Sequence, residues 1–249
     1  MPNIKSNISF SLVNIPVIMN PIIKNNDTSF NQLHKKCLNR ISYIKYCPHC
    51  KKNVKEVDII KGYKTSDDDY LTFTKEELSK LSIQNEKEIE IVSFIKENEV
   101  DPYYFEKSYY LNAPKNNKAY VLFCEALKKT KKVALCKTVI SSKFYYGILS
   151  FKDNGIIMNT LYFNEEVNIP ENNLTKEIKP KELEMAVKLI ESLSGKFEPQ
   201  KYKDEYQDRI KNAINDKLKG KSIKRVKKTN KRQISDLMKA LEFSLKEAK

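Results

Sequence analysis

The chain has 249 residues, a formal net charge of +14 at pH 7 and a hydrophobic content of 40%. This length allows one large domain or two small ones with a buried core, and the positive charge favours a polyanionic partner, either nucleic acid or an anionic membrane surface. With five glycines and no Gly-x-x-x-x-Gly-Lys pattern, the sequence excludes a P-loop for nucleotide phosphates.

The first half of the chain is predicted to be mostly β-strand. Hydrophobic residues alternate on one face up to Leu12 and on the other face from Val13, which predicts one strand over Ile8–Val17 with a bulge, ended by Pro16 and Pro21. The surrounding uncharged stretch contains prolines and asparagines, which suit neither a membrane span nor a signal peptide, so we expect a soluble cytoplasmic protein without membrane contact. Further strands are predicted at Val54–Tyr63, Leu71–Phe73, Ile89–Ile95 and Tyr103–Leu111.

The second half mixes helices with three more strands. A capping box of Thr74 and Glu77 starts a short helix, and an apolar stripe predicts a longer one over Lys118–Lys129. An antiparallel meander with short turns is then predicted, followed by three amphipathic helices. The meander strands are Val133–Ile140, Phe144–Phe151 and Ile156–Phe163, and the later helices are Lys181–Leu193, Pro199–Leu218 and Gln233–Ala248. The fold class expected from this order is α+β, mostly β.

Three of the five cysteines cluster with a histidine in the pattern His34-x2-Cys37-x9-Cys47-x2-Cys50. Ligands two residues apart can bind one tetrahedral ion, and a second such pair can complete a structural zinc site. The alternative is that these thiols are small buried hydrophobic groups or simply free. Both interpretations stay open, although the odd number of cysteines favours a reduced compartment over a disulfide framework.

No catalytic pattern accompanies this cluster. The base-deaminase signature requires a His-x-Glu sequence upstream of the cysteines, which is absent, and no His-Glu-x-x-His sequence occurs. Two histidines in the whole chain leave few candidates for a general base. Cys124 and Cys136 have no histidine partner in the sequence, so we expect both in the core.

The basic residues are the strongest functional signal. Nine positive charges and no acidic residue lie in the sixteen residues Lys217–Arg232, which is too dense for an ordinary helix face. Neutralising phosphates is the simplest use of such a segment, and no base-reading module is evident, so we expect binding to the nucleic-acid backbone. The predicted DNA contacts are Lys35, Lys36, Arg40, Lys45, Lys131, Lys132, Lys137, Lys224, Arg225, Lys227, Lys228, Lys231 and Arg232.

Several blocks of the sequence resemble bacterial Ku, the DNA end-binding protein of non-homologous end joining. They occur in the same order as in that family and cover nearly the whole chain. The blocks are ISFSLVNIPV (Ile8–Val17), FNQLHKK (Phe30–Lys36), DIIKGY (Asp58–Tyr63), VDPYYFEKSYYL (Val100–Leu111), KAYV (Lys118–Val121), EAL (Glu125–Leu127) and ELEMAVKLIESLSGKFEPQKYKDEY (Glu182–Tyr206). SDLMKALEFSLKEA (Ser235–Ala248) is similar to the C-terminal stretch of bacterial Ku.

The resemblance implies a β-barrel core with helical dimerisation arms and a ring-shaped homodimer through which a DNA end threads. It also implies a non-enzymatic, nucleoid-associated protein that recruits the ATP-dependent repair DNA ligase and requires no cofactor, and it leaves the zinc question open. We expect a core over residues 1–218, with a basic linker and C-terminal amphipathic helix over 219–249. Candidate dimer contacts are Leu183, Ile190, Tyr202 and Tyr206. The alternative is a monomeric zinc-ribbon adaptor that binds RNA or single strands.

Overall fold

The computed structural model describes residues 3–66, 68–81, 88–114, 117–171 and 178–223. The chain divides into two compact units. The first comprises Met1–Asn25 and Gln32–Ile169, and the second comprises Asn26–Asn31 and Pro170–Lys249. The two units are described separately.

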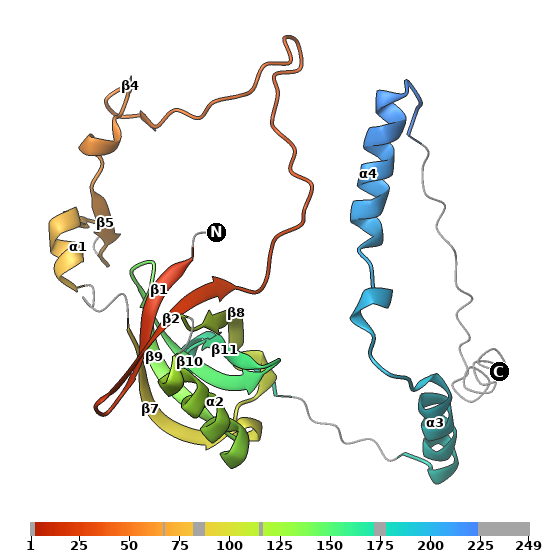
Figure 1. Cartoon of the computed structure of the whole chain (residues 1–249). Coiled ribbons are helices and arrows are strands. Elements are labelled where there is room, and N and C mark those ends of the chain that lie inside the picture. Colours follow the sequence, from red (N-terminus) through yellow and green to blue (C-terminus); the bar gives the residue numbers. More distant parts are fainter. Residues whose placement is uncertain (1–2, 67, 82–87, 115–116, 172–177, 224–249) are drawn as a thin grey trace. The chain divides into compact units, whose positions relative to one another are not determined.

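A closed β-barrel is the centre of the first unit (Figure 1). Its strands follow the order β1-β2-β8-β11-β10-β9-β7, and neighbours are antiparallel except for β1 and β7, which are parallel and close the barrel. The strands are β1 (Ile4–Phe10), β2 (Val13–Pro21), β7 (Glu88–Lys96), β8 (Phe105–Asn112), β9 (Lys132–Ile140), β10 (Lys143–Lys152) and β11 (Gly155–Leu161). This barrel confirms the mostly-β expectation for the core.

The prediction of one bulged strand over Ile8–Val17 is wrong, because the chain turns there and forms the β1–β2 hairpin. Ser11 adopts a positive φ of 51°, and the neighbouring Leu12 is 99% exposed at the turn. Pro16 lies inside β2 and does not end it, whereas Pro21 is the last residue of β2 as expected. Pro16 pairs with Asn7 of β1, while the pairing of β2 with β8 begins only at Ile18, so the missing amide proton of Pro16 costs no bond on that side.

The predicted meander β9–β10–β11 is confirmed, and its strands are antiparallel. Both of its turns are two-residue turns in which each residue has a positive φ, as right-twisted hairpins prefer. The turn residues are Ser141, Ser142, Asp153 and Asn154, with φ between 50° and 63°. Within these strands, Cys136, Leu149 and Met158 have no exposed surface and form part of the barrel core.

Helix α2 (Lys118–Thr130) packs against the barrel. Phe123, Cys124 and Leu127 are buried on its inner face. The predicted apolar stripe is right for Phe123 and Leu127 but wrong for Leu122, which is 72% exposed. Tyr120 joins the helix to two strands: its hydroxyl donates to the Leu111 carbonyl at 2.6 Å and accepts from the Ile156 amide at 3.1 Å. Burial raises the pKa of Tyr120 to about 12, which keeps this hydroxyl protonated.

A long excursion, here called the arm (residues 32–81), lies between β2 and β7. Its elements are small: β3 (Tyr46–Cys47), β4 (Lys52–Asn53), β5 (Lys61–Lys64), β6 (Tyr70–Phe73) and α1 (Lys75–Leu81). The predicted capping box is present, since Thr74 Oγ1 accepts from the Glu77 amide and Glu77 accepts from the Thr74 amide. The strand predicted over Val54–Tyr63 is wrong in its first part, where a 3-10 turn lies at Glu56–Asp58.

The second unit contains α3 (Pro180–Leu193) and α4 (Glu205–Leu218). The single helix predicted over Pro199–Leu218 is wrong, because only a 3-10 turn lies at Pro199–Lys201 and α4 begins after Asp204. The Asp204 carboxylate caps α4 by accepting from two amides of its first turn.

Gln207 of α4 also holds the short segment Asn26–Asn31. Its side-chain oxygen accepts from the Thr28 amide at 3.0 Å, and its nitrogen donates to Asp27 at 3.3 Å. The predicted helix Gln233–Ala248 lies outside the described residues. No helix in the described part of the chain is long and apolar enough to cross a membrane.

Candidate nucleic-acid interface

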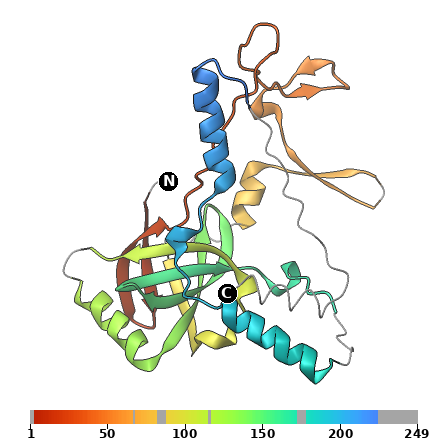
Figure 2. The same ribbon diagram turned by 90° about the vertical axis from the view of Figure 1, so that its right-hand side faces the viewer.

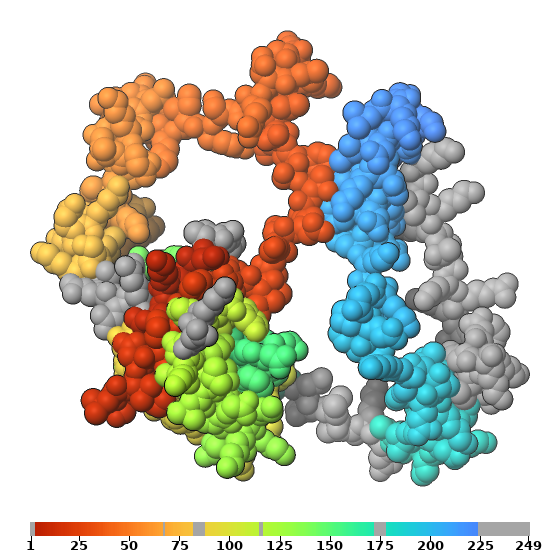
Figure 3. Space-filling model, viewed as in Figure 1, coloured from red at the N-terminus to blue at the C-terminus, as the bar shows by residue number. Residues whose placement is uncertain are grey.

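The first part of the arm, Gln32–Lys64, forms an exposed basic surface that the sequence prediction covered only in part. Between Gln32 and Lys64 the sequence has nine basic residues and two acidic ones, and all nine basic residues are exposed. The space-filling view shows the orange part of the arm as a narrow run of atoms rather than a packed layer (Figure 3). Such a surface can place many cations along a polyanion without burying any of them.

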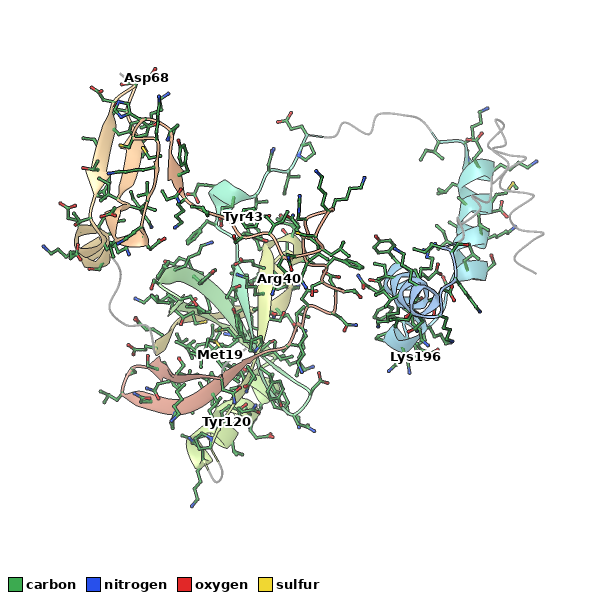
Figure 4. All side chains as sticks on the ribbon, turned by 90° about the horizontal axis from the view of Figure 1, so that it is seen from above. Met19, Arg40, Tyr43, Asp68, Tyr120 and Lys196 are labelled. Carbon is green, nitrogen blue, oxygen red and sulfur yellow. The ribbon has the colours of Figure 1, made fainter. Side chains whose placement is uncertain are left out.

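Lys35, Lys36 and Arg40 lie in one turn at the start of the arm. The turn is closed by a β-bridge between Leu33 and Arg40 and by a bond from the Leu38 amide to the His34 carbonyl at 2.8 Å. Seen from above, Arg40 lies close to Tyr43 on the same stretch (Figure 4). The local backbone therefore fixes where these cations project.

Lys45 and Lys137 are both held in ion pairs with carboxylates. Lys45 pairs with Glu56 across the base of the β3–β4 hairpin, and Lys137 of β9 pairs with Glu90 of β7 at 3.0 Å. The Lys45 ammonium also holds the pKa of the Glu56 carboxyl below its usual value. A phosphate would have to compete with these carboxylates, so the two lysines are weaker candidates than Lys35 and Lys36.

Lys131 and Lys132 belong to a different part of the first unit. Lys131 ends α2 in a left-handed conformation with φ 53°, and Lys132 starts β9. Figures 1 and 2 show α2 on a different side of the barrel from the arm. The structure therefore does not bring these two lysines together with Lys35, Lys36 and Arg40.

Five exposed lysines between Gln32 and Lys64 were missed by the sequence prediction. They follow the cysteine pair and continue into β5, where the preceding sequence suggested an ordinary strand. They are Lys51, Lys52, Lys55, Lys61 and Lys64. A charge count over the whole of Gln32–Lys64 would have found them. The predicted contacts from Lys224 to Arg232 lie outside the described residues.

The four predicted metal ligands form two separate pairs. His34 Nδ1 lies 3.1 Å from Cys37 Sγ, and the Cys50 amide donates to Cys47 Sγ at 3.5 Å. Within the described ranges no group of three or more histidine, cysteine, aspartate or glutamate side chains gathers as metal ligands would. Each pair is therefore formed locally, but the two pairs are not joined in one chain.

The clustered thiols differ from the two remaining ones in their surroundings. Cys37 and Cys50 are exposed and Cys47 is partly exposed, whereas Cys124 and Cys136 are buried. Hydrogen bonds from the Cys50 amide and from the Cys50 thiol lower the pKa of Cys47. The bond between the two thiols raises the pKa of Cys50. Burial raises the pKa of Cys136 to about 12. The core location expected for Cys124 and Cys136 is confirmed, and burial does not explain the clustered three.

The closed barrel has a match among known protein families. The family model of the Ku70/Ku80 beta-barrel domain matches residues 9–185, which is more than half of the chain. The chain belongs to the Ku family. The match covers all of the barrel strands except Ile4–Ile8 of β1 and includes the arm.

Curated relatives extend the similarity to nearly the full length. A protein of Lachnoclostridium phytofermentans named "Non-homologous end joining protein Ku" is 38% identical over 246 residues, covering 98% of this chain and 96% of its own. Proteins with the same name from Desulfitobacterium hafniense and Bacillus subtilis are 38% and 35% identical and are covered over 86% and 80% of their length. Membership of the Ku family confirms the resemblance seen in the sequence.

Proposed function

We propose that this Ku-family chain binds the ends of double-stranded DNA in non-homologous end joining, without reading the base sequence. The observation that carries this proposal is the first part of the arm, Gln32–Lys64, an exposed segment with nine basic and two acidic residues. The arm itself is inserted in the closed barrel between β2 and β7. The names of its relatives, which are non-homologous end joining proteins, support the same assignment.

Binding follows from charge and geometry. Lysine and arginine side chains along the arm neutralise phosphates and release their counterions, which provides affinity that does not depend on sequence. Lys35, Lys36 and Arg40, together with Lys51, Lys52 and Lys55, are the proposed contacts on the arm. Lys131, Lys132, Lys224, Arg225, Lys227, Lys228, Lys231 and Arg232 are proposed as auxiliary contacts, and Lys45 and Lys137 as contacts that first have to release their carboxylates.

The functional form is proposed to be a ring-shaped homodimer. The exposed apolar face of α3 supports this proposal, because none of its residues is buried although the helix is amphipathic. Leu183, Val187 and Ile190 recur at helical spacing and are all exposed, as are Tyr202 and Tyr206 before and within α4. A second copy covering these side chains would remove a large apolar surface from water.

End specificity is proposed to arise from topology. A closed ring admits a free DNA end but not an uninterrupted circle, so no base contact is required. The protein would act without turnover in the cytoplasm on nucleoid DNA, protect the end and recruit the ATP-dependent repair DNA ligase. We place the boundary of the core near Leu218 and assign residues 219–249 to a basic linker and a C-terminal helix.

A structural zinc ion is proposed for the arm, bound by His34, Cys37, Cys47 and Cys50. The two ligand pairs are each followed by a residue in the left-handed region, Leu38 and Lys51. This ion would stiffen the arm and take no part in DNA chemistry. DNA end binding itself is proposed to need no cofactor.

The test compares duplexes of the same length and sequence that differ only in having ends. The purified full chain should bind linear duplex and bind a relaxed closed circle at least roughly tenfold more weakly, and linearising the circle should restore binding. The affinity for linear duplex should fall by roughly 10³-fold between 50 and 200 mM salt if about six phosphates are neutralised. Equal affinity for circle and linear duplex would reject the ring, and a preference for single strands or RNA would favour the adaptor function instead.

A further inference from the structure

The zinc ligands of the arm occur as two half-sites with similar backbone geometry. In the first turn, His34 and Cys37 are followed by Leu38 with φ 58°, and in the second, Cys47 and Cys50 are followed by Lys51 with φ 50°. Each turn is flanked by antiparallel pairing, Leu33 with Arg40 in the first and the β3–β4 ladder in the second. The residue after the second ligand is therefore left-handed in both turns, so the two turns share the same backbone conformation at this position.

The ligand atoms of the first pair are spaced for binding one ion. Zn–N bonds of about 2.0 Å and Zn–S bonds of about 2.3 Å at a tetrahedral angle place the two ligand atoms roughly 3.5 Å apart. His34 Nδ1 and Cys37 Sγ are 3.1 Å apart. The second pair is joined by the bond from the Cys50 amide to Cys47 Sγ. Each turn can therefore supply two ligands with little rearrangement.

Two ligands do not complete a structural zinc site, which takes four. Among the residues that the structure describes, no third histidine, cysteine or carboxylate joins either pair. The two turns also lie on separate stretches of a narrow arm (Figures 2 and 3). A complete site therefore needs two more ligands from outside each pair.

We infer that a second copy of the chain completes each site: His34 and Cys37 of one protomer bind the same zinc ion as Cys47 and Cys50 of its partner. This inference rests on the homodimer of the proposed function. In the proposed arrangement the twofold axis crosses the two arms, which then run antiparallel, so that the first turn of one protomer meets the second turn of its partner. The same symmetry operation generates an identical second site, giving two zinc ions per dimer.

The arm carries two further features that suit contact with a second copy. Its apolar side chains at and between the turns are all exposed, and a partner arm would cover them. They are Leu33, Leu38, Ile41, Tyr43, Ile44 and Tyr46. Three thiolates and one neutral imidazole around Zn²⁺ have a net charge of −1, and the exposed Lys35, Lys36 and Lys51 beside the ligands balance this charge.

The test uses complementary half-site variants of the full chain, with zinc ions per dimer counted by native mass spectrometry. The first variant, His34→Ala with Cys37→Ala, lacks the first turn's ligands, and the second, Cys47→Ser with Cys50→Ser, lacks those of the second turn. Both are also co-expressed with different tags and purified as a heterodimer. Cys124→Ala removes a thiol elsewhere and serves as the control.

The wild type and the control should each hold two zinc ions per dimer, and each variant homodimer should hold none. The heterodimer should hold one, because one complete site is rebuilt across the interface. A heterodimer without zinc would overturn the inference in favour of a site within one chain. A first-variant homodimer that keeps one ion would show that identical turns pair with each other, and a wild type without zinc would remove the metal altogether.

A second measurement does not depend on whether the variants fold. Wild-type protein stripped of metal and treated with the thiol oxidant diamide should form a covalent dimer on a non-reducing gel. Peptide mapping of that dimer should identify a disulfide between Cys37 and Cys47 or Cys50. Only disulfides within one chain would contradict the inference. End binding measured on the same zinc-loaded samples separates the two proposals: a zinc-bridged dimer that ignores DNA ends would reject the proposed function and leave this inference intact.

Discussion

At the scale of single residues, the important distinction is between lysines whose charge is free and lysines whose charge is already paired. Lys137 and Lys45 look equivalent to Lys35 and Lys36 in the sequence, yet the fold places a carboxylate beside each of the first two. The partner Glu90 is 47 residues away from Lys137 in the chain and reaches it only because β7 and β9 are neighbours. Sequence composition alone could not have revealed this difference.

Replacing Lys35 and Lys36 together by alanine should weaken binding to linear duplex by roughly tenfold at moderate salt. The loss should be the same for duplexes of different sequence, and the slope of log affinity against log salt should decrease by about one for each lost phosphate contact. Lys137→Ala is the matched control and should change affinity less, since its ammonium is already paired. Electrophoretic mobility shifts over a salt series measure both quantities, and an equal loss in the control would contradict the distinction.

At the scale of elements, the sequence predicted correctly those strands and helices that have a strong hydrophobic periodicity. The meander and α2 agree with the sequence to within a few residues, because alternation and a helical stripe each persist over several turns of pattern. The β1–β2 hairpin was missed because its turn contains Leu12, an apolar residue that continues the alternating pattern although it is 99% exposed. The break before α4 was missed because it depends on the capping bonds of Asp204.

The candidate metal site was also predicted only in part from the sequence. Local spacing predicted both ligand pairs, and the structure forms each of them within one turn. Whether the pairs meet depends on chain segments that have no periodic pattern, so the sequence could not decide it. The left-handed conformations of Leu38 and Lys51 were equally invisible, since neither residue type favours them.

Tyr120→Phe tests how α2 is fixed to the barrel. The variant removes the donor to the Leu111 carbonyl and the acceptor of the Ile156 amide, and should lower the free energy of unfolding by about 1–3 kcal/mol. Tyr63→Phe, on the exposed arm, is the control and should have little effect. Chemical denaturation followed by circular dichroism measures the difference.

The same variant carries a pH signature. Burial raises the pKa of Tyr120 to about 12 from an ordinary value of 10. The unfolded chain therefore loses this proton from about pH 10 while the folded chain keeps it, so the stabilising contribution is complete below pH 10 and decreases as the pH rises toward 12. The stability difference between wild type and Tyr120→Phe should shrink over this window. A constant difference would mean that the hydroxyl is not held protonated by the fold.

At the scale of the whole molecule, the second unit has too little buried surface for its apolar content. Helix α3 buries no residue, and Ile190 on its apolar face is 67% exposed. A helix of this kind is normally stabilised by packing rather than by its own propensity. Its partner in the proposed dimer would therefore stabilise the helix as well as join the two copies.

Ile190→Glu should convert the proposed dimer into monomers. Loss of the burial of one isoleucine side chain weakens association by roughly 10- to 100-fold, and burying a carboxylate adds to this. Ser192→Glu introduces the same charge on the opposite side of α3 and should leave the mass unchanged. Sedimentation velocity measures the mass, and preference for DNA ends should disappear together with the dimer. A dimeric Ile190→Glu variant would place the interface elsewhere.

The parallel closure of the barrel has an evolutionary consequence. β2 and β7 flank β1 on opposite sides, and the end of β2 and the start of β7 lie near the same end of β1, where Met19 pairs with Ile4 and Glu88 with Asn7. With neighbouring strands about 4.8 Å apart and a rise of about 3.3 Å per residue, Pro21 and Glu88 are separated by about 20 Å, which about six residues could span. The arm is thus an insertion that can lengthen, shorten or change its composition while the barrel keeps its register. Substitutions in the arm can therefore change the proposed affinity for DNA without changing the stability of the barrel.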